Sequence, residues 1–115
     1  MRIENASRQT LVADRALLAR NPVTRLVGLL NRNHLEPGEG LVLQPGGAIH
    51  MFFMRMPIDV IFADKEGNVL KTSTNLRPWR VAMAPRRNRY TIELPVGAIE
   101  SSATEPGDHL DLTQS

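Results

Sequence analysis

The stretch from Ile49 to Leu70, IHMFFMRMPIDVIFADKEGNVL, decides how this chain folds. It contains two apolar runs separated by Pro57, and the second run ends in a polar loop, DKEGN, of the length that joins paired strands. Proline cannot donate a hydrogen bond to a neighbouring strand, so we expect a bulge, an edge or a bend at Pro57. The stretch therefore predicts an antiparallel strand pair that follows an irregular turn.

The rest of the chain repeats this pattern of short apolar runs bounded by glycine and proline. Such runs are typical of strands in a β-rich domain. The expected strands are TLVA (10–13), ALLA (16–19), LVL (41–43), RVAMA (80–84), YTIEL (90–94) and the end of PGDHLDL (106–112). PVGAIESSA (95–103) suits one helical turn at most.

One longer helix is predicted at about residues 22–31. Asn21 is a favoured helix cap and Pro22 a favoured first residue, and apolar residues then recur at helical spacing. The combination predicts a mainly β (α+β) fold: a twisted, antiparallel, barrel-like sheet of short strands with this helix packed against it. At 115 residues we expect a single domain, 1–115.

Composition excludes several classes of site. The chain has no cysteine, which rules out disulfides, thiolate metal sites and a cysteine nucleophile. No apolar run approaches the roughly 20 residues that cross a bilayer, and the start lacks a secretory apolar segment. We therefore expect a soluble protein without a membrane span, located in the cytoplasm.

Asp59 stands out because it lies in PIDVIF, between residues that look buried on both faces. A buried carboxylate is costly unless it is paired or well hydrogen-bonded. The expected partners are Arg55, Arg25 from the predicted helix, or backbone N–H groups at the Pro57 bend. Two roles stay open: a structural anchor for the bend, or one wall of a polar pocket with His50 and Arg55.

The methionines and histidine of the same stretch raise the question of a soft metal such as Cu(I), which favours thioether and imidazole ligands. On a strand, His50, Met54 and Met56 share one face. Methionine is also a common filler of irregular cores, and Phe52 and Phe53 mark both faces as apolar. We therefore predict core packing, with no metal and no cofactor.

Five arginines fall between residues 77 and 89 with no acidic residue among them. Trp79 and Tyr90 are interleaved with them, a pattern found in proteins that bind single-stranded nucleic acid. Acidic residues follow at Glu93, Glu100, Glu105, Asp108 and Asp111. The simpler interpretation, which we favour at this level, is that neighbouring strands carry opposite charges and pair across the sheet.

The motifs TRLVGLLNR, LEPGEGLVLQP and IHMFFMRMPIDVIFADKEGNVL, followed by LRPW and IELPVG, resemble the bacterial and archaeal family called domain of unknown function 192. The resemblance covers nearly the whole chain. Ala48 stands where relatives often carry cysteine, and Met51 and Met56 replace threonine and phenylalanine, as packing changes would. The resemblance implies a compact, β-rich, barrel-like fold and supplies no activity.

The leading functional hypothesis is a non-catalytic binding or accessory module with a polar pocket near His50, Arg55 and Asp59. Its partner would be a small anionic ligand or a protein, and nucleic acid is the less favoured partner. One alternative is a small hydrolase or lyase that uses His50 and Asp59 as acid and base. Another is a single-stranded nucleic-acid binder that uses the segment from Arg77 to Arg89. The candidate binding residues are Arg25, His50, Phe52, Arg55, Asp59 and Trp79.

Overall fold

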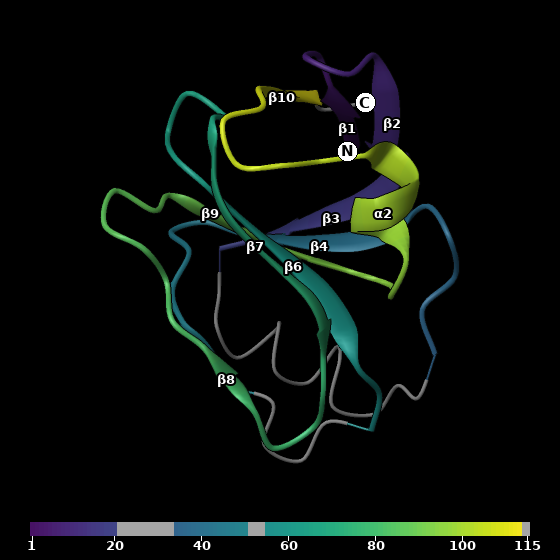
Figure 1. Cartoon of the computed structure of the whole chain (residues 1–115), viewed down its shortest axis with the longest axis vertical. Coiled ribbons are helices and arrows are strands. Elements are labelled where there is room, and N and C mark those ends of the chain that lie inside the picture. The colour runs from purple at the N-terminus through teal and green to yellow at the C-terminus, as the bar shows by residue number, and fades with distance from the viewer. Residues whose placement is uncertain (21–33, 51–54, 114–115) are drawn as a thin grey trace.

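The computed structural model describes residues 1–20, 34–50 and 55–113. Within these ranges it contains short strands and one short helix (Figure 1). The elements are β1 (Arg2–Asn5), β2 (Thr10–Ala13), β3 (Arg15–Ala19), β4 (Glu39–Leu43), β5 (Ile49–His50), β6 (Ile58–Ala63), β7 (Val69–Leu76), β8 (Val81–Ala82), β9 (Tyr90–Leu94), α2 (Ala98–Ser102) and β10 (Leu110–Thr113). The mainly β (α+β) class predicted from the sequence is confirmed.

A five-stranded sheet in the order β3-β4-β9-β6-β7 forms the centre of the molecule. The predicted hairpin is present as β6 and β7, which pair antiparallel, and β9 pairs with the other edge of β6. Figure 1 shows these strands crossing the middle of the molecule with a marked twist. The sheet ends at β3 and β7 and does not close into a barrel among the described residues.

One strand pair departs from the antiparallel expectation, because β3 and β4 run parallel. Residues 20–38 connect these strands, and that length exceeds the dozen or so residues that a parallel crossover needs. The helix predicted at about 22–31 falls in this connection and lies outside the described residues. The single turn predicted within 95–103 is present as α2.

Strand β6 is buried along its whole length because apolar side chains cover both of its faces. Ile61 packs with Ile3, Ile92 and Leu94 in one cluster. The residues on either side of it, Val60 and Phe62, belong to a second cluster, which also contains Leu35, Leu43, Met56, Ile58 and Ala82. A strand with core on both faces has a continuous apolar sequence rather than an alternating one. Met56 is 6% exposed within this cluster, as core packing predicts.

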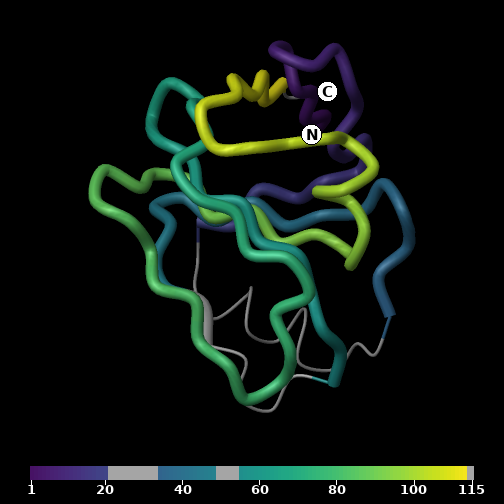
Figure 2. The backbone as a smooth tube through the Cα atoms, in the orientation of Figure 1, coloured from purple at the N-terminus to yellow at the C-terminus, as the bar shows by residue number. Residues whose placement is uncertain are grey.

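The two ends of the described chain lie side by side in a three-stranded sheet of order β10-β1-β2 (Figure 2). Asn5 of β1 joins them with buried side-chain hydrogen bonds to Thr104 and to Asp108, at 3.1 and 3.0 Å. Arg8 adds an ion pair of 3.1 Å to the Asp108 carboxylate. This network connects the first strand to the loop before the last one.

Asp108 is only 6% exposed, and the pKa of its carboxyl group is lowered. The hydrogen bond from Asn5 is the main cause; burial opposes it, and the Glu105 N–H and Arg8 lower the pKa further. The charged form is therefore favoured in the folded state. Stability that depends on it is present at neutral pH and is lost as the pH falls through the folded-state pKa.

We expect Asp108→Asn to destabilise the protein by about 2 kcal/mol at neutral pH, since the acceptor of charge-assisted hydrogen bonds is lost. The deficit should shrink as the pH falls below the unfolded-state pKa of about 3.9, because the native carboxylate then becomes protonated too. Thermal melts between neutral and acidic pH measure both effects. The exposed Asp111→Asn is the matched control, and a deficit that stays constant with pH would contradict this account.

Candidate functional site

Asp59 lies at the start of β6 and is 1% exposed. One carboxylate oxygen accepts the backbone N–H of Asn75 at 2.9 Å. The other accepts the N–H groups of Gly97 and Ile99, both at 3.1 Å. Its partners are therefore backbone N–H groups, which was one of the alternatives predicted from the sequence. These groups belong to β7 and the start of α2, however, and not to the bend at Pro57.

A bulge in β7 presents the first of these N–H groups to Asp59. Ile58 pairs with Leu76 and Val60 pairs with Ser73, so two residues of β7 stand opposite Asp59. Asn75 is one of them and has a φ of 51°. Asparagine tolerates this left-handed conformation better than most residues. The irregularity expected near Pro57 thus falls on the partner strand.

The structure does not bring the predicted site residues together in the part of the chain it describes. Arg55 is exposed and makes no ion pair with the buried Asp59 among the described residues. Arg25, Phe52 and the side chain of His50 lie outside what is described. Trp79 is 61% exposed and belongs to a different segment.

That segment, residues 77–89, is called the basic arm below. It leaves β7 just after the bulge held by Asp59, runs through β8 and enters β9. In Figure 1 it follows the lower left border of the molecule. Within the described ranges β8 pairs only with the short strand β5. Lys71 of β7 donates a hydrogen bond of 3.0 Å to the Met83 carbonyl. The arm is therefore attached at both ends and near its middle.

A tight turn stands at each end of the basic arm. The Arg80 N–H donates to the Arg77 carbonyl, and the Asn88 N–H donates to the Pro85 carbonyl, both at 3.2 Å. The third residue of each turn has positive φ: 71° at Trp79 and 69° at Arg87. Glycine is the usual residue at such positions, and a bulky side chain there is strained. Two residues with large side chains thus occupy turn positions whose backbone conformation favours glycine.

The arginines of the basic arm carry unneutralised charge. All five are exposed, and none of their side chains forms a hydrogen bond or ion pair with another residue in ranges 1–20, 34–50 and 55–113: Arg77, Arg80, Arg86, Arg87 and Arg89. Three of the five acidic residues expected to pair with them have other partners. Glu105 and Asp108 pair with Arg8, and Asp111 pairs with His109. For these arginines the cross-strand pairing prediction is wrong.

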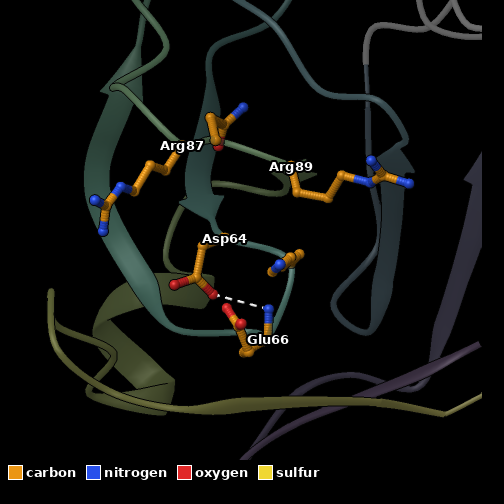
Figure 3. Close-up of a pocket in the computed structure, with 6 residues that line it drawn as sticks. Asp64, Glu66, Arg87 and Arg89 are labelled. Atoms are coloured by element: carbon orange, nitrogen blue, oxygen red, sulfur yellow. Dashed lines mark hydrogen bonds between the residues drawn. The ribbon is translucent and has the colours of Figure 1, made fainter.

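A hollow of about 480 Å³ lies between the second turn of the arm and the loop that joins β6 to β7 (Figure 3). Asp64 and Glu66 line it from the loop, and Arg87 and Arg89 line it from the arm. In this view the Arg87 side chain extends to the left and the Arg89 side chain to the right, and neither forms an ion pair with Asp64 or Glu66. The hollow therefore separates the charges instead of pairing them.

Asp64 shapes the loop rather than a binding site. Its carboxylate accepts the N–H groups of Glu66 and Asn68 at 3.0 and 2.9 Å and the Asn68 side-chain amide at 3.1 Å. Burial raises the pKa of Asp64, but these hydrogen bonds outweigh it and hold the pKa below its usual value. The carboxylate is thus committed to its own turn.

Sequence reasoning did not select Glu93 as a buried carboxylate. It is 3% exposed in β9, where it faces Leu41 of β4 and Val60 of β6 in the register. The local pattern gave no signal for this burial, because Thr91 and Glu93 alternate with Tyr90, Ile92 and Leu94 as on a strand with one exposed face. Over the described ranges, no group of three or more acidic or histidine side chains is arranged to hold a metal ion, and no helix is long and apolar enough to cross a membrane.

We expect Asp59→Asn to lower the free energy of unfolding by roughly 2–3 kcal/mol, because the amide cannot accept all three N–H groups and leaves buried donors unpaired. Chemical denaturation at neutral pH measures the loss. Asp111→Asn, at an exposed site, should change stability by less than about 1 kcal/mol. Equal stability of Asp59→Asn and wild type would show that the carboxylate does not anchor these segments.

Comparison with known proteins agrees with this architecture. A UPF0127 protein of Pyrococcus abyssi is 35% identical over an alignment 115 positions long, which covers 95% of each chain. A crystal structure of a protein of unknown function from Novosphingobium aromaticivorans superposes with a TM-score of 0.81 at 22% identity, covering 96% of this chain and 82% of that one. Another, from Sinorhizobium meliloti and provisionally described as a transcription regulator, gives 0.79 at 26% identity, covering 96% and 89%.

The family called DUF192, described as "Uncharacterized ACR", matches residues 3–112. The resemblance seen in the sequence motifs is thereby confirmed. The chain belongs to the DUF192 family.

Proposed function

We propose that this chain is a non-catalytic binding module that holds a phosphate-bearing ligand on its basic arm. The observation that carries the proposal is the set of five exposed arginines without a partner among the described residues. Guanidinium groups bind phosphate through two parallel hydrogen bonds. Elsewhere in the described chain, Arg2, Arg8 and Arg15 do pair with carboxylates.

The backbone of the arm supports a binding role. Positive φ at Trp79 and Arg87 costs about 1–2 kcal/mol at each residue, and such strain clusters at functional sites. Both strained side chains are exposed, so packing in the core does not compensate for the cost. Favourable contacts between a ligand and these two side chains would compensate for the strain.

The pocket first expected around His50, Arg55 and Asp59 is less well supported. Both Asp59 oxygens already accept backbone N–H groups, and the residue is 1% exposed. A carboxylate in that state is poorly suited to bind a ligand or to move a proton, since a general base must reach its substrate. These contacts favour the anchor role over the hydrolase or lyase alternative.

The Sinorhizobium meliloti protein, which has a similar fold, is provisionally described as a transcription regulator. That description belongs to the relative. For this chain the proposal rests on the charge and exposure of the basic arm.

Retention on a phosphate-bearing resin tests the proposal. We expect wild type to elute at a salt concentration that falls markedly in Arg87→Gly, because one phosphate contact is removed. The same change should leave the thermal midpoint nearly unaltered: relief of the positive-φ strain, about 1 kcal/mol, offsets the added flexibility of the unfolded chain.

Arg2→Gln is the matched control, since it removes one exposed arginine from β1, outside the arm. It should elute with wild type. If Arg2→Gln and Arg87→Gly shift elution equally, retention reports net charge alone and the arm is not the site.

A further inference from the structure

We infer that the ligand of the basic arm is a single strand of nucleic acid, with phosphates on the arginines and a base stacked on Trp79. This inference rests on the proposed phosphate-binding function and adds the class of ligand.

The arginines form two groups, one at each turn. Arg77 and Arg80 flank the first turn, and Arg86, Arg87 and Arg89 surround the second. The six residue steps from Arg80 to Arg86 cover at most about 20 Å of extended chain. A single small anion cannot contact both groups when the intervening segment is extended. A polymer of about four or more nucleotides can, and that is the lower range of site sizes for single-strand binders.

Exposed apolar side chains lie in the first turn and directly after it. Trp79 stands in that turn, and Val81 and Met83 follow it; the three are 61%, 42% and 64% exposed. Ala82, between Val81 and Met83, is 5% exposed and packs into the core. Side chains alternate at β8, so Val81 and Met83 face away from the core on the side opposite Ala82. The arm therefore presents exposed apolar side chains from Trp79 to Met83, with arginines before and after them.

This arrangement fits unpaired bases better than a duplex. A base in a single strand exposes an apolar face that can stack on an indole ring, whereas a duplex buries these faces between its own base pairs. The arm carries arginine and no lysine, and the planar guanidinium group also stacks on aromatic rings. An anionic lipid surface would also attract the arginines, but it would enclose Trp79 in acyl chains instead of stacking a base on it. The experiment below distinguishes these two ligands.

Trp79 is the only tryptophan of the chain, so its fluorescence reports directly on the site. The full chain is titrated with 12-residue single strands of DNA and of RNA, with a 12-residue abasic deoxyribose-phosphate strand, and with vesicles containing an anionic phospholipid. We expect quenching by the base-bearing strands and none by the abasic strand. Comparison of DNA with RNA shows which sugar is preferred.

Variants complete the experiment, with binding of labelled strands followed by anisotropy. Trp79→Leu should weaken binding to the base-bearing strand about tenfold and leave binding to the abasic strand unchanged, because stacking on the indole is lost. Arg87→Gly should weaken both and reduce the slope of log K against log salt by about 0.7, as expected for one phosphate contact on a single strand. Arg2→Gln should match wild type in both assays.

The outcomes separate this inference from the proposed function. Equal affinity for base-bearing and abasic strands, without quenching, would overturn base stacking and leave phosphate binding in place. A blue shift with vesicles and no binding of either strand would assign the arm to a lipid surface and overturn the inference. Absence of binding to every anionic probe would overturn both.

Discussion

The Asp59 carboxylate connects three segments that are far apart in the sequence. It accepts N–H groups from the bulge in β7 and from Gly97 and Ile99 at the start of α2, while its own strand lies between β9 and β7 in the five-stranded sheet. A buried charge is tolerated only when it is fully hydrogen-bonded, and three donors achieve this without a cation. The position of the strands around β6 depends on this arrangement.

The same interaction determines where the basic arm begins. The Asn75 N–H points toward Asp59, and β7 ends one residue later, at Leu76. The arm is then held at its middle by Lys71 and at its end by the Arg89 N–H, which donates to the Ala63 carbonyl at 2.8 Å. An exposed charged segment is thereby attached to a rigid core, which reduces the entropy that a ligand would have to remove on binding.

Charge is distributed unevenly over the described part of the molecule. Near the chain ends, Arg8 joins Glu105 and Asp108 in a network that contributes to folding. Along the arm, five arginines stay exposed without such partners. Like charges on one short segment repel each other, which destabilises the folded state. The backbone of the same segment is also strained, at Trp79 and Arg87. Both costs fall on the same segment, and Arg87 bears both of them, which is why the proposed function is assigned to the arm.

The sequence by itself determined the mainly β class, the β6–β7 hairpin and the burial of Asp59, because apolar runs, proline and turn residues act locally. It also marked the arginine cluster and Trp79. The parallel pairing of β3 with β4, the donors that hold Asp59 and the absence of acidic partners for the arm's arginines within the described residues were decided only by the tertiary structure. These features depend on which distant segments lie next to each other in the folded chain. Many N–H groups and cations could bind a carboxylate, and the tertiary structure determines which of them are close enough to do so.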